Sequence, residues 1–510
     1  MTDFTLPDID YAAISPLLVL FGVACAGVLV EALVPRRLRY PVQLWLALLG
    51  VAGALVAVLI RAGAEDVTTA GGSVTVDGPA LFMQGALLVF GLVALLLIGE
   101  RRIDGGAIVA QAAITVGSQG DRKQINQPGA TEVFPLTMFS IGGMALFITA
   151  NDLLVMFIAL EVLSLPLYLM CALARRQRLI SQEAAVKYFL LGAYASAFFL
   201  FGLVLAYGFA GSVDFPAIHA AVTESEMSPA LLYVALALIV MGLLFKAAAA
   251  PFHVWTPDVY QGAPTPITAF MAAGTKVAAF GGLLRVTYVA FEQLAEDWLP
   301  VLGVIAVLTM LLGAVMAVTQ TDIKRLLAYS WIANAGYVLI GVLAVGQAGA
   351  STTMFYLVAY GFAVLGAFAV ISLVRDDDGG EAPHLSRWAG LGRSSPVIAG
   401  VFTLVMLALA GIPLTAGFTA KFAVFSAALD AGEAWLVIAG VVSSVIIAFP
   451  YLRVVVMMWL SDPTDSTARL VSPGAFTGVA LAVGAIATIA LGVVPGPLLD
   501  LAHDAALFLR

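Results

Sequence analysis

Charged side chains lie in the middle of otherwise apolar stretches of this chain, and their types indicate acid–base chemistry. Glu161 stands within NDLLVMFIALEVLSLPLYLM, and Lys246 follows the run LLYVALALIVMGLLF. Lys276 lies in FMAAGTKVAAFGG, and Lys421 lies in GFTAKFAVF. One charge at the centre of a bilayer costs about 2.5–3.5 kcal/mol, so such residues are normally retained for function. One acid and three lysines placed in this way predict a row of groups that pass protons along through water.

The distance of these residues from polar or helix-breaking neighbours places them deep in the membrane. Glu161 follows Asp152 by nine residues, and nine residues of helix rise about 13 Å. Lys421 follows Pro413 by eight residues. Such depth leaves a short carboxylate unable to reach the surface. The alternative interpretation is that these charges form structural ion pairs that only hold helices together.

A proline that follows Lys246 by five residues, Pro251, interrupts the apolar segment. Proline removes a backbone hydrogen bond and clashes with the preceding turn, so the carbonyls of residues 246 and 247 should lose their helical partners. These carbonyls and trapped water could hold an ammonium group or accept its proton. A movement of the Glu161 charge relative to Lys246 would then switch whether the lysine keeps its proton. The alternative is that Lys246 snorkels past the break to the inner surface.

Further polar residues have weaker signals. Lys187 lies near the inner end of its segment, where snorkelling explains it as well as proton transfer does. His253 follows the break, and histidine titrates near neutral pH, which suits a proton entrance, although simple polar filling is the alternative. We expect Asp258 to cap a turn. We expect Arg285 and Arg453 to snorkel or to pair with acids of a partner subunit.

The composition shows what kind of protein must position these groups. The 510 residues are 62% hydrophobic and 11% charged, with a mean hydropathy of +1.02, whereas soluble proteins carry about 25% charged residues. This excludes a soluble catalytic domain and predicts an all-α integral membrane protein. The net charge of −8 argues against binding to nucleic acid. Cys25 and Cys171 are expected to be small core residues, because an iron–sulfur cluster needs four thiolates. We therefore expect no cofactor or metal in this chain.

Windows of about 20 apolar residues predict about fourteen transmembrane helices. If the N-terminus is outside, the inner loops hold sixteen of the 24 Lys and Arg residues, and the outer segments hold only Arg61 and Arg510. The positive-inside rule therefore places both termini on the outer side. The predicted spans are 13–34, 41–60, 79–98, 131–149, 152–174, 182–211, 229–250, 264–291, 299–319, 323–346, 351–374, 396–429, 434–460 and 473–498.

Spans four to thirteen form two blocks of five helices each, and a proline interrupts the fourth helix of each block. These prolines are Pro251 and Pro413. Because five is odd, the second block enters the membrane from the opposite side, which is the inverted repeat of many transporters. Ordinary proline kinks with a coincidence of lengths are the alternative. The predicted organisation is a three-helix segment at 1–130, a first repeat at 131–292, a second repeat at 299–460 and a C-terminal helix at 473–510.

Several motifs resemble a known family of membrane proteins. They are ALEVLSLPLY at 159–168, PFHVWTPDVYQGAPTPITAF at 251–270 with GTKVAAFGG after it, and GIPLTAGFTAKF at 411–422. These stretches are similar to the antiporter-like membrane subunits of bacterial proton-pumping NADH:quinone oxidoreductase, respiratory complex I. The sequence PDVYQGAPTP is most similar to the subunit N family within this group. The sister subunits M and L and cation/proton antiporter relatives more typically read PDAH there.

The resemblance implies a fourteen-helix proton-translocating subunit of the membrane arm, set in the bacterial plasma membrane beside sister antiporter-like subunits. NADH, FMN, iron–sulfur clusters and quinone would belong to partner subunits of that complex. By the same resemblance, Glu161 is the acid that pairs with Lys246, and Lys276 is the central relay. Lys421 lies on the path to the outside, and Lys187 has a less defined role. No nucleic acid is implied.

Two other interpretations stay open from the sequence. The chain could be a subunit of a multi-subunit Na⁺/H⁺ antiporter, for which sodium dependence in vesicles would be the sign. It could instead be a structural membrane scaffold, and then removal of the charges would lower assembly but not the protons moved per electron. The Gly- and Gln-rich loop at 99–130 is explained by none of these interpretations.

Overall fold

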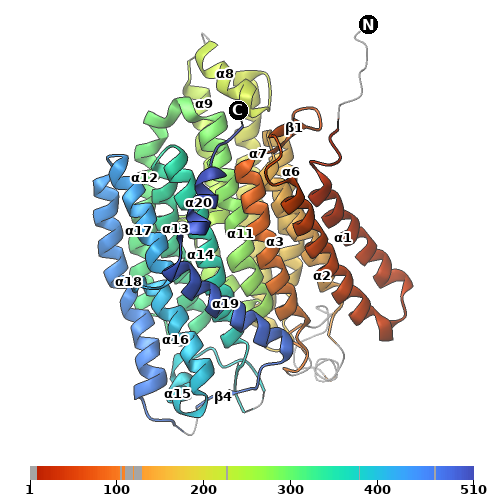
Figure 1. The fold of residues 1–510 in the computed structure, drawn as a ribbon, viewed down its shortest axis with the longest axis vertical. Coiled ribbons are helices and arrows are strands. Elements are labelled where there is room, and N and C mark those ends of the chain that lie inside the picture. The colour runs from red at the N-terminus through yellow and green to blue at the C-terminus, as the bar shows by residue number, and fades with distance from the viewer. Residues whose placement is uncertain are drawn as a thin grey trace.

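The computed structural model describes residues 9–103, 106–108, 119, 129–224, 228–377, 379–464 and 467–509, and most of the 99–130 loop lies outside them. The described chain forms a bundle of helices that run between two ends (Figure 1). In chain order the helices are α1 (Ser15–Leu33), α2 (Arg36–Arg61), α3 (Gly78–Gly99), α5 (Val133–Thr149), α6 (Leu153–Cys171), α7 (Arg178–Ala210), α8 (Phe215–Glu224), α9 (Ala230–Ala247), α10 (Trp255–Gly262), α11 (Thr265–Arg285), α12 (Ala295–Val318), α13 (Ile323–Leu343), α14 (Gln347–Ile371), α15 (Leu391–Ser394), α16 (Pro396–Ala410), α17 (Ala416–Asp430), α18 (Ala434–Leu460), α19 (Ala475–Val493) and α20 (Gly496–Asp504).

Twelve helices in the described part of the chain are long and apolar enough to cross a membrane. Helices α5 and α16 are apolar but shorter, with 17 and 15 residues. Each of the fourteen predicted spans overlaps one of the observed helices or a broken pair of them. The prediction of a helical integral membrane protein is therefore confirmed, while the count of fourteen crossings stays a prediction.

The chain leaves helical geometry at both predicted breaks. Pro251 lies in the gap between α9 and α10, and Ala248 at the end of α9 takes the left-handed conformation with φ 63°. Pro413 lies in the gap between α16 and α17, where Gly411 has φ 86°. A Cβ at Gly411 would lie 3.2 Å from the side chain of Lys421, so glycine lets that lysine approach the end of α16. The two interrupted helices are confirmed.

Three helices form the centre of the bundle. The most apolar windows of α11 and α13 are fully buried and that of α14 is 94% buried, whereas those of α1, α2, α7, α18 and α19 are at most 39% buried. In Figure 1, α11 runs through the middle, with α1 and α2 on one flank and α17 and α18 on the other. Cys171 is buried as expected, but Cys25 is exposed on peripheral α1, so the core prediction was wrong for Cys25.

Both ends of the described chain meet the connection between α2 and α3. This connection contains the antiparallel strands β1 (Val67–Thr69) and β2 (Val74–Val76). The backbone N–H of Asp10 donates to Thr69 Oγ1 at 2.7 Å, and that of Leu509 donates to Asp77 Oδ2 at 3.1 Å. A second strand pair, β3 (Val374–Arg375) with β4 (Arg469–Leu470), lies toward the opposite end (Figure 1). The two chain ends therefore share one end of the bundle, as an even number of crossings requires, and which side of the membrane they face stays a prediction.

A fully buried ion pair joins α11 to the start of α3. Arg285 Nη2 lies 2.7 Å from Asp77 Oδ1, and both side chains are 0% exposed. The Arg285 Nε donates to the Ile148 carbonyl at 3.0 Å, and its guanidinium lies 5.3 Å from the ring centre of Phe508. Asp77 also caps α3 by accepting from the Ala80 N–H. The expectation that Arg285 snorkels or pairs with a partner subunit is wrong, because its acid belongs to its own chain.

Candidate functional site

The three lysines that the sequence singled out are all buried in the bundle. Lys246 lies at the end of α9, Lys276 in the middle of α11 and Lys421 in α17, with exposed fractions of 4%, 1% and 6%. In the described part of the chain, no carboxylate lies within 4.0 Å of any of these three amines. The three amines therefore do not snorkel to a surface. Aromatic rings, backbone carbonyls and hydroxyl groups surround them instead.

Aromatic side chains of α6 and α7 surround the amine of Lys246. Its Nζ lies 3.4 Å from the Tyr188 hydroxyl oxygen. It also lies 5.5 Å from the ring centre of Tyr168 and 5.2 Å from that of Tyr188, which meet edge to face. A cation within about 6 Å of a ring face is attracted by the ring quadrupole. The two tyrosines can therefore support a charged amine here without an adjacent acid.

The predicted partner of Lys246 stands apart from it. Glu161 lies on α6, two helical turns before Tyr168, and is partly buried. Among the described residues, Glu161 Oε1 has no hydrogen-bond partner. Buried carboxylate oxygens are normally hydrogen-bonded, and water commonly supplies the missing donor. The ion pair that the resemblance implies is therefore not formed in this structure, and Tyr168 lies in the region between the two groups.

Lys276 sits at the free end of α9. The Phe245 carbonyl accepts a hydrogen bond from Trp255 Nε1 at 3.0 Å, and the Ala247 carbonyl accepts one from Trp331 Nε1 at 2.7 Å. Between them, the Lys246 carbonyl accepts a hydrogen bond from Lys276 Nζ at 3.5 Å. The Lys276 Nζ also lies 5.2 Å from the ring centre of Trp255 and 5.1 Å from that of Trp331. The break therefore does free carbonyls for an ammonium group, but that group belongs to Lys276 and not to Lys246.

Lys421 occupies the corresponding place at the second break. Its Nζ donates to the carbonyls of Leu409 and Ala410, the last two residues of α16, at 3.3 and 3.2 Å. It lies 4.8 Å from the ring centre of Tyr337. The carbonyl end of a helix carries partial negative charge, which favours a cation there. At each break, carbonyls at the end of the interrupted helix therefore accept hydrogen bonds from a lysine amine.

A small cavity and several hydroxyls lie between the centre of the bundle and Lys421. The cavity has a volume of about 10 Å³ and is lined by Asn334, Tyr356, Tyr360 and Lys421, among others. A volume of this order admits about one water molecule. Tyr356 donates to Asn334 Oδ1 at 2.5 Å, and Tyr360 packs on Trp331 with ring centres 4.7 Å apart. These hydroxyl and amide groups lie beside the amine of Lys421, where one water molecule can join them.

The sequence reasoning missed this polar face of α13. Ser330, Asn334 and Tyr337 follow one another at intervals of four and three residues, which places them on one side of the helix. The Ser330 hydroxyl is hydrogen-bonded to the Tyr451 hydroxyl, and Tyr337 donates to Ser443 Oγ at 3.0 Å. The periodic polar residues in an apolar span were the signal that could have found them.

Two lower-ranked candidates lie outside the buried lysine row. Lys187 is 42% exposed and binds Asp258 Oδ2 at 2.6 Å and Glu183 Oε1 at 2.7 Å. Asp258 also binds Arg325 Nη1 at 2.6 Å, so it bridges two cations from within α10, and the expectation that it caps a turn is wrong. His253 lies in the gap after α9, and its Nδ1 has no partner among the described residues.

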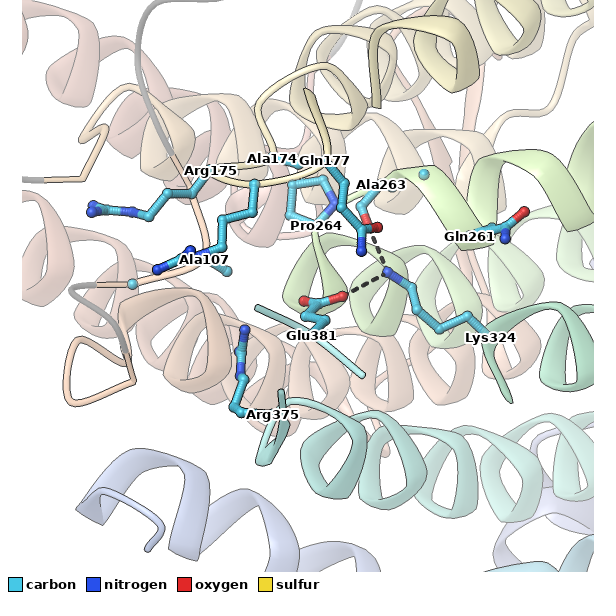
Figure 2. A pocket seen from close by; sticks show the side chains of 13 residues that line it. Ala107, Ala174, Arg175, Gln177, Gln261, Ala263, Pro264, Lys324, Arg375 and Glu381 are labelled. Carbon is cyan, nitrogen blue, oxygen red and sulfur yellow. Dashed lines mark hydrogen bonds and ion pairs between the residues drawn. The ribbon is translucent and has the colours of Figure 1, made fainter. Parts of the chain in front are cut away.

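An ionic pocket of about 30 Å³ lies among the α6–α7 connection, the end of α10, the start of α13 and the segment after α14, and the sequence reasoning did not find it (Figure 2). Lys324 Nζ lies 3.2 Å from Glu381 Oε2 and donates to the Ala263 carbonyl at 2.9 Å. Thr265 donates to Glu381 Oε1 at 2.6 Å, and Arg375 also lines the pocket. Burial alone would raise the pKa of the Glu381 carboxyl. The positive charges of Lys324 and Arg375 lower this pKa by more than burial raises it, so the pKa lies below its ordinary value.

We expect the loop that carries Glu381 to loosen when the pH falls. A carboxyl whose pKa is depressed by folding stabilises the fold fully above its ordinary pKa of 4.5, and this stabilisation is lost as the pH falls through the lower folded value. Hydrogen exchange of residues 372–385, corrected for intrinsic chemistry, should accelerate below that pH. Glu381→Gln is the matched control, because it should exchange faster at neutral pH and lose this pH dependence. An unchanged pH profile in the variant would contradict the assignment.

Comparison with known proteins places the chain in a family. The family model described as NADH:quinone oxidoreductase/Mrp antiporter, TM, matches residues 150–447. A NADH-quinone oxidoreductase subunit N from Salinispora arenicola is 66% identical over 519 residues, which cover 100% of both chains. A chain of respiratory complex I from Thermus thermophilus with bound aureothin is 33% identical, with a TM-score of 0.77, over 95% of this chain and 98% of that chain. A chain of the Mrp complex from Dietzia, at 23% identity, shows the same fold with a TM-score of 0.81 over 96% of this chain and 97% of that one. The chain therefore belongs to the NADH:quinone oxidoreductase/Mrp antiporter transmembrane family and, within it, to the subunit N proteins.

Proposed function

We propose that this chain is the proton-translocating subunit N of the membrane arm of NADH:quinone oxidoreductase, as a multi-pass protein of the bacterial plasma membrane. Its 66% identity to a subunit of that name over both whole chains supports this function. NADH, FMN, the iron–sulfur clusters and quinone then belong to partner subunits of complex I. This chain contributes the proton path and is driven by its neighbours, which include the sister antiporter-like subunits.

The relay consists of Glu161, Lys246, Lys276 and Lys421. The observation that carries it is that three lysine amines are buried at helix breaks and packed against hydroxyls, indoles and free carbonyls, with no carboxylate in ion-pair contact in the described chain. A buried ammonium tied to a carboxylate would be a structural pair. An amine on polarisable rings and carbonyls can instead accept and release a proton without breaking a salt bridge.

Lys187 and His253 have supporting places in the proposal. Lys187, partly exposed in its ion pairs with Asp258 and Glu183, is a collector of protons at one end of the bundle. His253 stands in the break, beside the free end of α9, and is suited to feed the row of lysines. Both termini lie outside in this proposal, because the Lys and Arg residues of the sequence then gather in the inner loops.

The two blocks at 131–292 and 299–460 serve in the proposal as inverted repeats, flanked by the segment at 1–130 and the helix at 473–510. Their support is the matching position of the two breaks, each of which ends on a lysine amine. A Na⁺/H⁺ antiporter subunit is the second candidate function, because the Mrp chain from Dietzia shares the fold. The identity of that chain is 23%, against 66% for the subunit N relative, so the first function is preferred.

We expect Lys421→Met to uncouple transport from electron transfer. Methionine keeps most of the length of the side chain and loses the charge, so α16 and α17 should still pack. Proton uptake per NADH oxidised is measured in inside-out vesicles. The share of protons that this chain carries should fall at least about tenfold, because the proton must cross the middle of the membrane without an amine. Assembly should not change, and sodium should have no effect. A lower amount of complex with a normal proton ratio would favour a scaffold, and a sodium requirement would favour an antiporter.

A further inference from the structure

A groove of about 400 Å³ lies between α9 and α12, away from the buried lysines. Leu236, Val240 and Met241 of α9 form one wall, and Val301 and Ile305 of α12 form the other. Helix α9 packs on α7 and α11, whereas α12 packs on α13 and α18. The groove therefore follows the seam between the two proposed repeats on the outside of the bundle, where Ala237 and Val301 are exposed, and its walls are apolar.

One end of the groove is polar and acidic. The Tyr233 hydroxyl donates to Asp297 Oδ2 at 3.0 Å, and both residues line the groove. Trp298, which also lines it, donates its Nε1 to the Phe291 carbonyl. Tyr and Trp are typical of the membrane–water interface. Residues 286–321 contain three acids, Glu292, Glu296 and Asp297, and no Lys or Arg, so this end of the groove presents negative charge at headgroup level.

The size of the groove decides what fits it. From Tyr233 to Leu244 the α9 wall rises about 16 Å, which is close to half of a hydrocarbon core of about 30 Å. A helix with its side chains is about 10–12 Å wide, so about 16 Å of helix fills at least about 1,200 Å³, which exceeds the space in the groove. One hydrocarbon chain fits, and a transmembrane helix does not.

We propose that this groove binds one acyl chain of a phosphatidylethanolamine molecule, whose ammonium group is held by Asp297. An ethanolamine ammonium carries N–H donors and positive charge, which match an exposed carboxylate. A choline headgroup has no N–H to donate, and an anionic glycerol headgroup would meet the acids of this end. The far end of the groove reaches Phe252, in the gap between α9 and α10, so the bound chain packs against the break.

Photolabelling of the intact complex tests the site, and it requires no transport activity. The purified complex is placed in vesicles of phosphatidylcholine and phosphatidylglycerol that contain a trace of a diazirine-acyl probe, either phosphatidylethanolamine or phosphatidylcholine. The ethanolamine probe should label peptides from 233–252 and 297–305 about fivefold more than the choline probe does. Asp297→Asn should remove this preference, and Ala237→Trp, which fills the groove from an exposed position, should remove the labelling.

Two matched variants separate the site from general effects. Glu296→Gln removes a neighbouring exposed acid that does not line the groove, and Val234→Trp adds the same bulk to an exposed α9 position outside it. Both should label as the parent chain does. Equal labelling by the two probes in the parent would overturn the headgroup assignment. Absence of labelling in the intact complex would overturn the lipid proposal, because a partner subunit would then cover the groove.

Discussion

Lys246→Ala should abolish proton transport through this chain while leaving the complex assembled. Without the amine, a proton that passes the α9 break meets the cost of a bare charge at mid-membrane, about 2.5–3.5 kcal/mol. That barrier corresponds to a decrease of about a hundredfold in rate. The two tyrosines that face the amine stay in place, so the packing of α6, α7 and α9 should change little. NADH-driven acidification of inside-out vesicles is the measurement.

A charge removed elsewhere provides the control for this result. Arg469 is 78% exposed in its ion pair with Asp377, so Arg469→Ala should leave both assembly and pumping unchanged. Lys246→Arg provides a second comparison, because arginine keeps the positive charge and does not release its proton in proteins. It should assemble and yet fail to pump. Normal pumping by either Lys246 variant would remove this residue from the proton path.

Asp77→Ala should have the largest effect on the amount of assembled complex. The change leaves the guanidinium of Arg285 fully buried without its acid, and breaking a buried pair in this way costs about 3–5 kcal/mol. The α3 cap and the anchor of Leu509 are lost as well. Such a cost is a large part of a typical net stability of about 5–15 kcal/mol. The chain recovered in the purified complex, and its thermal unfolding, are the measurements.

The double variant Asp77→Ala/Arg285→Met tests the cause. Replacement of both buried charges by apolar groups is often close to neutral, so the double variant should recover much of the lost stability. Asp77→Asn should fall between, because the amide oxygen still accepts from the Ala80 N–H but carries no charge. If the double variant is as unstable as Asp77→Ala, the cap and the C-terminal anchor, not the stranded charge, dominate the effect.

The sequence was sufficient to predict the features that rest on local chemistry. Pro251 and Pro413 lie at interrupted helices, as the proline ring predicts, although Pro166 and Pro450 stay inside α6 and α18, so proline does not break every helix that contains it. The burial of Lys246, Lys276 and Lys421 followed from long apolar surroundings that leave no surface within reach. The free carbonyls after the first break were also predicted from backbone geometry alone.

The partners of these groups could not be predicted, because they come from distant segments. Arg285 and Asp77 are 208 residues apart, and neither has a local signal that names the other. Tyr188 and Trp331 look like ordinary aromatic residues of apolar spans, so hydropathy does not mark them as contacts of Lys246 and Lys276. The sequence around Asp258 suggests a turn. Only the fold shows that Lys187 and Arg325 bind its two carboxylate oxygens.

Contacts between the two proposed repeats limit how the molecule can move. Asp258 holds Lys187 on one side and Arg325 on the other, while the Trp331 indole is bonded to a carbonyl at the end of α9. Rocking one repeat against the other would break the Asp258–Arg325 pair and the Trp331 hydrogen bond, and the buried Trp331 N–H left unpaired would cost about 1–3 kcal/mol. We therefore expect proton transfer through this chain to proceed by side-chain rotation and bound water while the two repeats stay in contact.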